Sequence, residues 1–429
     1  MFRQKLLLSF TYFLCIAIIL IQACNKKVND PDGNDDPLEI DYLPSWTEGY
    51  LDIHAINTGK GECTFFILPD GTTMLVDAGA VLTPPPESVP RPNGTRSPHE
   101  WITRYIKNKL KDFSFPKLDY IILTHFHWDH MGEITSDMPT SSSGAYKLSG
   151  ITGVAEDISF GKIIDRGWPD YDWPVIIDDN KMNNYLNFID WQVNNRGDVI
   201  EFFEPGVNDQ IVLVKEPDTY TNFEIRNIGV NGYVWTGSGS EVQNHFPPTE
   251  EFEETGYPPE NACSIAFRVS YGNFDYFTGG DISFRGAESG HAEDQWKNIE
   301  IPIASAIGAV DVLKANHHGN WDANCDTFLS TLHPRVIVIH TWLDDQPAYT
   351  TWQRMNSTKI FPDPPDIFVT NILDAKKIEL GSEIYKMKSI QGHVVIRVEP
   401  GGGSYNVYVL DDSSESYMIK TVYGPYISN

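Results

Sequence analysis

One stretch of this 429-residue chain decides its fold and its chemistry: Leu118-Asp119-Tyr120-Ile121-Ile122-Leu123-Thr124-His125-Phe126-His127-Trp128-Asp129-His130. Its first half is mostly apolar, with aromatic and β-branched side chains, which predicts a buried strand. Its second half sets three imidazoles and a carboxylate within six residues, and so dense a polar group cannot be a satisfied part of a core. Imidazole and carboxylate are ligands that Zn²⁺ prefers, so the sequence predicts a metal site at the end of this strand.

The spacing of these ligands indicates two neighbouring metal positions. In an extended segment, His125 and His127 can point in the same direction, because side chains two residues apart share a face. Asp129 and His130 then turn toward a second position nearby. A surface cluster of histidines that binds no metal is the alternative interpretation, and the spacing disfavours it.

The residues before this stretch predict several strands and then a helix. Residues 51–56 alternate between apolar and polar side chains, as a half-buried strand does. Residues 63–68 and 73–76 flank the turn sequence Pro69-Asp70-Gly71 and predict a hairpin. Ser97-Pro98-His99-Glu100 combines an N-cap serine, a proline at the first helical position and a glutamate at the third, which predicts a helix start. The pattern therefore favours an α/β fold.

Further motifs follow the same order as in a known family. The pattern H-x-H-x-D-H after a buried strand resembles the metal motif of the metallo-β-lactamase superfamily. The other motifs resemble one of its branches, the hydrolase domain of ComEC-type competence channels and its free-standing relatives. The resemblance covers about residues 50–400 and rests also on Thr58-Gly59-Lys60-Gly61-Glu62, Leu75-Val76-Asp77-Ala78-Gly79, Tyr276-Phe277-Thr278-Gly279-Gly280-Asp281 and Ala309-Val310-Asp311-Val312-Leu313-Lys314-Ala315-Asn316-His317-His318-Gly319.

This resemblance implies a four-layer αβ/βα sandwich with the metal site at the edge between two β-sheets. It implies zinc as the cofactor, bound as one or two ions, with manganese as the other candidate metal. The implied ligands are His125 and His127 for the first ion, Asp129 and His130 for the second, Asp281 for both, and for the second ion also one member, which the sequence does not single out, of the pair His317 and His318.

One ligand that is common in the superfamily is missing from this chain. Many members carry a further first-site histidine just before the hairpin that leads to the bridging aspartate. Here that stretch reads Pro259-Glu260-Asn261-Ala262-Cys263-Ser264. Glu260, Asn261, a water molecule or the more distant His245 would have to take its place, so occupancy of the first position stays open.

Three other residues are candidates for orienting the ligands or contacting a substrate. Asp77 ends a predicted strand, where it either orients the ligand loop or only caps the following turn. Lys314 lies within the histidine-glycine motif of the resemblance. His340 ends the apolar segment 335–340, where it either contacts the substrate or is purely structural.

The N-terminus predicts export and a lipid anchor. The basic residues Arg3 and Lys5 precede an apolar run over 6–21, which is shorter than the roughly 20 residues of a membrane-spanning helix. The run ends just before Cys24 in a pattern that resembles the lipobox of bacterial lipoproteins. Residues 1–23 are therefore expected to be a signal peptide and Cys24 the lipidated residue, with an uncleaved N-terminal anchor as the alternative.

The rest of the chain divides into three predicted parts. Residues 24–48 are rich in Asp, Asn, Gly and Pro and lack periodicity, which predicts a flexible acidic tether. Residues 49–412 are expected to form the hydrolase domain, with a long insertion at about 139–257 that would lie over the active-site groove. Residues 413–429 are expected to be a C-terminal tail. The protein would then be anchored to a bacterial membrane, on its periplasmic side or at the cell surface.

The net charge of the chain narrows the class of substrate that we expect. With 59 acidic against 32 basic residues, the formal net charge is −27, which argues against an extended nucleic-acid surface. A metal cluster supplies positive charge locally, so we expect a small-molecule or short phosphoester substrate. A metal-activated water would hydrolyse it, with Asp129 or Asp281 handling the proton. Two other functions stay open: hydrolysis of an amide, lactone, β-lactam or thioester, and non-catalytic metal binding by a surface lipoprotein.

Overall fold

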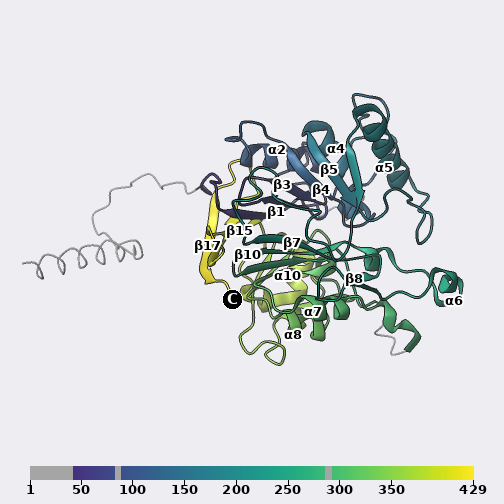
Figure 1. Cartoon of the computed structure of the whole chain (residues 1–429). Coiled ribbons are helices and arrows are strands. Elements are labelled where there is room, and N and C mark those ends of the chain that lie inside the picture. Colours follow the sequence, from purple (N-terminus) through teal and green to yellow (C-terminus); the bar gives the residue numbers. More distant parts are fainter. Residues whose placement is uncertain (1–41, 83–87, 286–291) are drawn as a thin grey trace, which may run out of the picture. The chain divides into compact units, whose positions relative to one another are not determined.

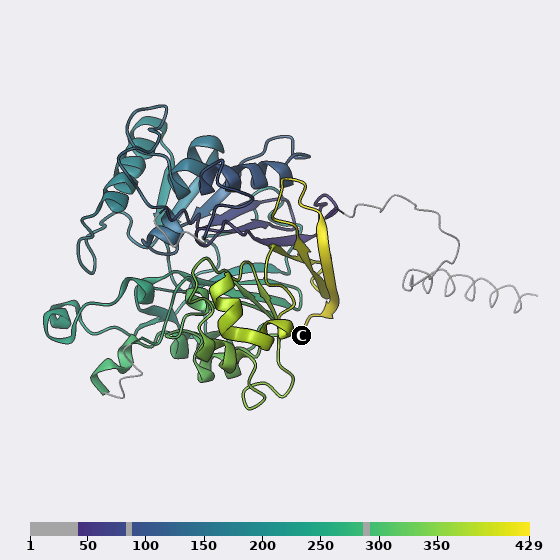
Figure 2. The same cartoon turned by 180° about the vertical axis from the view of Figure 1, so that it is seen from behind.

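Two large β-sheets face each other and carry helices on their outer surfaces (Figure 1), and Figure 2 shows the same arrangement from behind. The computed structural model describes residues 42–82, 88–285 and 292–429. Residues 42–429 form a single unit by their contacts. The predicted signal peptide, Cys24 and the first part of the predicted tether lie outside the described residues.

The first sheet has nine strands in the order β17-β16-β15-β1-β2-β3-β4-β5-β6. Strands β3 to β6 are parallel, so each must be reached by a crossover, and helices supply these crossovers. The strands are β1 (Leu51–Ala55), β2 (Thr64–Ile67), β3 (Thr73–Val76), β4 (Leu118–Ile122), β5 (Phe160–Asp165), β6 (Val199–Phe202), β15 (His393–Val398), β16 (Ser404–Leu410) and β17 (Ile419–Ile427).

The second sheet has eight strands in the order β14-β13-β12-β11-β10-β7-β8-β9. Its strands β11 to β14 are also parallel and are joined by helices. The strands are β7 (Phe223–Val230), β8 (Tyr233–Trp235), β9 (Val242–Asn244), β10 (Ala266–Tyr271), β11 (Phe274–Thr278), β12 (Val312–Lys314), β13 (Val336–Ile339) and β14 (Asp366–Val369).

In the part of the chain that the structure describes, the helices are short, and the two longest span 12 residues each. Among the described residues, no helix combines the length and the apolar character that crossing a membrane requires. The α-helices are α2 (Pro98–Lys109), α3 (Trp128–Met131), α4 (Gly150–Asp157), α5 (Asn180–Trp191), α6 (Phe252–Thr255), α7 (Glu300–Ile307), α8 (Asp326–Leu332), α9 (Tyr349–Met355) and α10 (Asp374–Leu380).

Three hydrophobic clusters define four layers. The inner cluster joins the facing sides of the two sheets, where the rings of Phe66 and Tyr276 meet edge to face at 5.7 Å. A second cluster packs the first sheet against α2, α4 and α5, and a third packs the second sheet against α7 to α10. Alternate residues of β2 serve different clusters, because neighbouring side chains of a strand point to opposite faces. The predicted αβ/βα sandwich is confirmed.

Three predicted boundaries differ from the structure. The region 139–257 does not lie over the site as a separate insertion, since it supplies β5 and β6 to the first sheet and β7 to β9 to the second. The predicted tail 413–429 contains β17, which pairs with β16 along the sheet edge. The last part of the predicted tether folds onto the domain, where Leu43 and Trp46 pack against the outer cluster of the first sheet.

Candidate metal centre

The histidine-rich segment follows β4 and continues into the single turn of α3. His127 is the N-cap of α3, so the chain changes direction between His127 and His130. Two neighbouring loops hold this turn: Glu62 N donates to Asp129 O at 2.8 Å, and Ala78 N donates to His130 O at 2.8 Å. The approach is too close for a side chain, because a Cβ on Gly79 would lie 2.0 Å from Asp129 O.

The other candidate residues also follow parallel strands of the two sheets. Asp77 follows β3, Asp281 follows β11, the His317-His318 pair follows β12, and His340 follows β13. Because the carboxyl ends of neighbouring parallel strands meet at one edge of a sheet, these side chains are gathered there. The two sheets thus present their functional edges to each other.

Asp281 lies at the centre of the cluster. Its Oδ2 atom lies 3.2 Å from His130 Nε2, 3.4 Å from His318 Nε2 and 3.9 Å from both His125 Nε2 and His317 Nε2. Ser264 Oγ accepts a hydrogen bond from Asp281 N at 3.2 Å. Asp281 therefore faces histidines from both sheets at once, as a carboxylate shared by two metal positions would.

The residues that the sequence assigns to two metal positions lie around this carboxylate. His125 Nε2 and His127 Nδ1 lie 3.0 Å apart, so both rings point to one spot. On the other side, His318 Nε2 donates to Asp129 Oδ2 at 3.0 Å, and His130 Nε2 lies 3.9 Å from the same oxygen. The structure therefore brings together the ligand sets that the sequence predicts for each position.

The His317-His318 pair sits in a short turn with unusual backbone angles. Both residues have positive φ, 47° and 54°, which non-glycine residues rarely adopt. His318 Nε2 faces Asp129 and Asp281, so His318 is the member of the pair that faces the second position. His317 Nδ1 donates to Asp322 Oδ1 at 2.8 Å. Its Nε2 lies 3.9 Å from Asp281 Oδ2, and Asn261 Nδ2 donates to it at 3.2 Å.

The three residues that could substitute for the missing histidine differ in their position and in their hydrogen-bond partners. Glu260 is held by an ion pair with the buried Arg166 and accepts from Phe126 N at 2.7 Å, so its oxygens are engaged. Asn261 contacts His317 and keeps Oδ1 without a hydrogen-bond partner among the described residues. His245 lines a separate cavity beside β8 and α7. Of these three residues, Asn261 therefore remains the candidate for completing the first position.

Two further predicted residues, Asp77 and His340, contact the ring nitrogens of ligand histidines that point away from the cluster. Asp77 Oδ2 accepts from His130 Nδ1 at 2.8 Å, and Asp77 Oδ1 accepts from Thr124 N at 2.8 Å. The carbonyl oxygen of His340 accepts from His318 Nδ1 at 3.2 Å, while its ring reaches Thr64 Oγ1 at 3.2 Å. These contacts fix which nitrogen of each ligand imidazole faces the cluster.

Sequence reasoning did not assign Glu62 to the site. Glu62, His130, Asp281 and His318 each offer a ligand atom, and these four atoms lie within 4.8 Å of one another. Glu62 also forms a buried ion pair with Lys314, whose Nζ lies 2.8 Å from Oε1. The signal was a carboxylate inside the glycine-rich motif 58–62, but nothing local shows that this loop folds onto the cluster.

The charges of the cluster shift several pKa values. Burial lowers the pKa of the His318 imidazole, but the carboxylates of Asp281 and Asp129 outweigh it and raise the pKa to about 10. The pKa of His130 is likewise raised well above its ordinary value, by Asp281, Asp77 and Asp129 against the effect of burial. Conversely, despite burial, His130 and His318 hold the pKa of Asp281 well below its ordinary value.

The donor set fits a divalent metal ion. His130 Nε2 and Asp281 Oδ1 are buried and have no hydrogen-bond partner within the part of the chain that the structure describes. The raised pKa values of His130 and His318 favour protons opposite the carboxylates, and a cation that bound there would release such protons. Imidazole nitrogens with carboxylate oxygens are the ligands of zinc and related metals.

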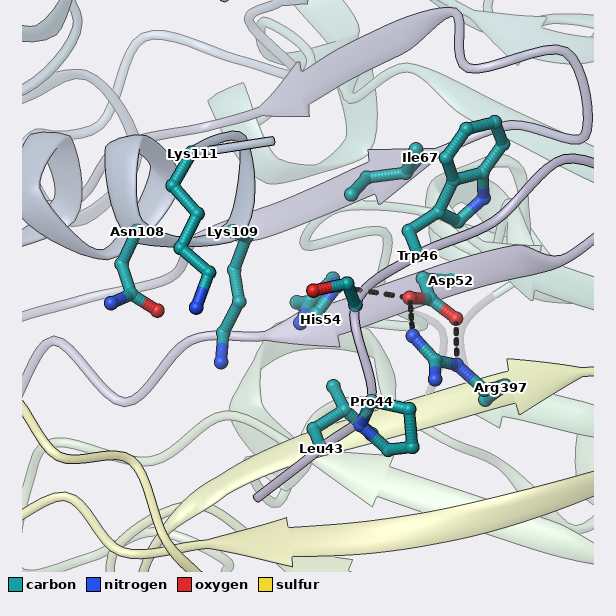
Figure 3. A pocket seen from close by; sticks show the side chains of 11 residues that line it. Leu43, Pro44, Trp46, Asp52, His54, Ile67, Asn108, Lys109, Lys111 and Arg397 are labelled. Carbon is teal, nitrogen blue, oxygen red and sulfur yellow. Dashed lines mark hydrogen bonds and ion pairs between the residues drawn. The ribbon is translucent and has the colours of Figure 1, made fainter. Parts of the chain in front are cut away.

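A small cavity elsewhere in the first sheet does not contain these groups (Figure 3). It measures about 40 Å³ and lies beside the end of α2, under the segment 43–46. Its charged groups include Lys109 and the ion pair of Asp52 with Arg397, whose Nε lies 2.7 Å from Asp52 Oδ1. His54 Nε2 lies 3.8 Å from Asp52 Oδ2, but Arg397 already pairs with this carboxylate, so the cavity is not a second candidate centre.

Comparison with known proteins agrees with this geometry. Residues 58–135 match the family model described as the metallo-beta-lactamase superfamily. The chain is also similar to a crystal structure from Parabacteroides distasonis that is provisionally named a metal-dependent hydrolase. The identity is 12%, the match covers 74% of this chain and 92% of that one, and the TM-score of 0.34 is too low to support an argument. No curated protein matches the chain. The family match and the two-sheet architecture support a hydrolase of this superfamily.

Proposed function

We propose that this protein is a metal-dependent hydrolase that cleaves small or short phosphodiesters with an activated water molecule. The observation that carries the proposal is the convergence of histidines and aspartates from both sheets on the carboxylate of Asp281. The likeness of motifs 58–62, 75–79 and 309–319 to the ComEC-like branch supports a phosphodiester in particular. The likeness of the H-x-H-x-D-H motif supports zinc as the metal, in one or two ions.

The nucleophile in this proposal is water rather than a side chain. Cys63 and Cys263 are fully buried, and burial raises the pKa of Cys63 well above its ordinary value and that of Cys263 to about 12. A thiol in such surroundings is inert, because the thiolate is the reactive form. When bound, a divalent ion would lower the pKa of a water ligand to about 7 and polarise the phosphoryl oxygen.

The chain's own residues have distinct tasks in this proposal. Asp129 is the carboxylate of the cluster with the most exposed side chain, at 11%, against 1% for Asp281. It is therefore placed to accept the proton of the attacking water. Asp281, which is enclosed by histidines, is placed to hold the ligand sets of both positions together. Asp77 and His340 fix the orientation of the rings from behind.

The exposed side of the cluster indicates how a substrate would enter. His127 and His317 are partly exposed, whereas His125, His130 and His318 are buried. Trp128 follows His127 directly, and Trp321 precedes Asp322, which holds His317; about half of each indole is exposed, 48% and 51%. Flat amphipathic rings beside the opening are suited to the part of a substrate that does not react. This arrangement and the net charge of −27 favour a short substrate.

The location of the protein belongs to the proposal as well. The lipobox-like pattern supports cleavage before Cys24 and anchoring of the exported protein to a bacterial membrane by a lipid. Mass spectrometry of the N-terminal peptide from membranes of the producing cells tests it. An acylated Cys24 is the expected result, and an unmodified peptide that begins at Met1 would contradict it.

The activity is tested with two chromogenic substrates, a phosphodiester and a β-lactam. We expect the Zn²⁺-loaded protein to hydrolyse the phosphodiester, and Asp281→Asn to lose at least a hundredfold in kcat/KM. Phosphodiester turnover that survives exhaustive chelation, or that Asp281→Asn retains, would overturn the proposal. Turnover of the β-lactam alone would replace the phosphodiester with an amide-type substrate. Tight metal binding without turnover of either would favour the non-catalytic function.

A further inference from the structure

The two halves of the metal centre belong to different sheets. Asp129 follows β4 of the first sheet, whereas Asp281 follows β11 of the second. The centre keeps its shape only while the two sheets keep their spacing at this edge. One buried ion pair, Glu62 with Lys314, lies across this boundary, since Glu62 is in the loop between β1 and β2 and Lys314 ends β12.

Glu62 contacts the first half of the centre through its backbone and the second half through its side chain. Its N–H donates to Asp129 O at 2.8 Å, and its carbonyl oxygen accepts from Gly79 N at 2.7 Å. Its Oε1 lies 2.8 Å from Lys314 Nζ, and its Oε2 lies 3.6 Å from His318 Nδ1. One residue thus reaches ligands that derive from both sheets.

Lys314 continues the chain of contacts to the central carboxylate. Besides pairing with Glu62, its Nζ donates to Gly280 O at 2.7 Å, directly before Asp281. Both side chains of the pair are 1% exposed, so solvent neither screens their attraction nor solvates either charge alone. The pair therefore connects the loop of Asp129 to the loop of Asp281.

Glu62 is close enough to be considered a ligand, but Lys314 pairs with one of its two carboxylate oxygens. Its Oε1 pairs with Lys314, whereas its Oε2 lies 3.6 Å from His318 Nδ1 and has no hydrogen-bond partner among the described residues. His318 presents its other nitrogen, Nε2, to Asp129 and Asp281. His318 Nδ1 donates to the carbonyl oxygen of His340, so Glu62 acts on the centre chiefly through its pair with Lys314.

We propose that Glu62 and Lys314 form a positioning pair, which holds the two halves of the centre in register across the sheets. This inference rests on the metal centre proposed above. It predicts the direction in which Lys314→Met changes the affinity for the cation. Removal of a positive charge near a cation site would by itself tighten cation binding. Loss of the pair instead releases Gly280 and leaves Glu62 buried without its partner, so binding should weaken.

The measurement is Zn²⁺ affinity of the full chain by competition with a chromophoric chelator, alongside urea unfolding of the metal-free protein. We expect Lys314→Met and Glu62→Gln each to weaken Zn²⁺ binding about 10- to 100-fold, as changes behind metal ligands do. The double variant Glu62→Gln/Lys314→Met leaves no unpaired buried charge. It should regain most of the lost stability and still bind Zn²⁺ at least tenfold more weakly than the wild type.

A matched control lies within a single sheet. Asp52 on β1 and Arg397 on β15 form another buried ion pair, on directly opposed positions of neighbouring strands (Figure 3). Arg397→Met leaves a buried carboxylate unpaired, as Lys314→Met does, but the cavity it faces contains no residue of the centre. We expect it to lower the stability while Zn²⁺ affinity stays within about twofold of the wild type.

The outcomes separate this inference from the proposed function. Zn²⁺ binding by Lys314→Met as tight as in the wild type, or tighter, would overturn the positioning pair, and so would wild-type affinity in the double variant. The double variant decides the question if a single variant does not fold. A wild-type chain that binds no Zn²⁺ would overturn the metal centre and this inference with it.

Discussion

Replacement of Asp77 by asparagine tests how the centre is supported. Asp77 is fully buried, and its two oxygens accept three hydrogen bonds: from Thr124 N at 2.8 Å, from Thr124 Oγ1 at 2.7 Å and from His130 Nδ1 at 2.8 Å. Its φ of 59° suits asparagine nearly as well as aspartate, so the backbone is retained. In Asp77→Asn, one oxygen becomes an NH₂ group that faces donors instead of accepting from them.

The expected loss follows from this count of bonds. A hydrogen bond to a charged group contributes about 1.5–3 kcal/mol, and a buried donor without a partner costs about 1–3 kcal/mol. We therefore expect Asp77→Asn to lower the free energy of unfolding by about 3 kcal/mol. Because His130 loses the group that fixes its Nδ1 proton, Zn²⁺ affinity should fall about 10- to 100-fold.

Urea unfolding of the metal-free protein and Zn²⁺ competition measure the two effects separately. Asp119→Asn is the matched control, because Asp119 is also buried at 4% exposure and accepts from Thr73 N at 2.9 Å. The control should lose stability and keep its Zn²⁺ affinity. A loss below about 1 kcal/mol in Asp77→Asn together with unchanged Zn²⁺ affinity would refute the reasoning.

Two further predictions concern acid stability and close packing. Burial lowers the pKa of His393 to about 3, whereas an unfolded imidazole titrates near 6.5. Its contribution to stability is thus complete above pH 6.5 and falls by about 2 kcal/mol between pH 7 and 5. The free energy of unfolding, measured with urea, should fall more steeply over this range for the wild type than for His393→Gln. Equal slopes would contradict the lowered pKa of His393. Gly79→Ala should weaken Zn²⁺ binding at least tenfold, because its Cβ would lie 2.0 Å from Asp129 O. Gly94→Ala, whose Cβ would meet nothing within 4 Å, should leave Zn²⁺ affinity unchanged, and equal affinity in both variants would speak against the close approach.

The fold class was predictable because its signals are local. The apolar run of β4, the hairpin around Gly71 and the capping box at Ser97 each depend on neighbouring residues, and all three are present. The ligands from His125 to His130 were predictable for the same reason, since six consecutive residues carry the pattern. Sequence alone therefore sufficed for the architecture and for one half of the candidate centre.

Two edge strands, β9 and β17, escaped prediction because they are poorly buried. In β9 all three residues are exposed, and in β17 only one of nine is buried. Such strands need no alternation of apolar and polar side chains, which is the signal that sequence reasoning uses. Edge strands are recognised mainly by their partners, and those partners are distant in sequence.

Two features of the site depend on tertiary structure alone. The choice between His317 and His318 is made by two consecutive positive φ angles, which no residue type in this turn announces. The ion pair between Glu62 and Lys314 joins residues of different sheets, and their motifs give no indication that they meet. The sequence thus supplied most of the ligands, while the fold supplied the contacts that orient them.

The division of the centre between two sheets also has a consequence for the stage of folding at which the chain can bind metal. Asp129 and His318, which lie 3.0 Å apart, are separated by 189 residues of chain. Bringing such distant residues together is entropically costly until the segments between them have folded. A nascent chain that ends before residue 281 lacks every donor that the second sheet supplies. Bound metal would therefore mark only finished molecules, and the metal content of a preparation would measure how much of it has matured.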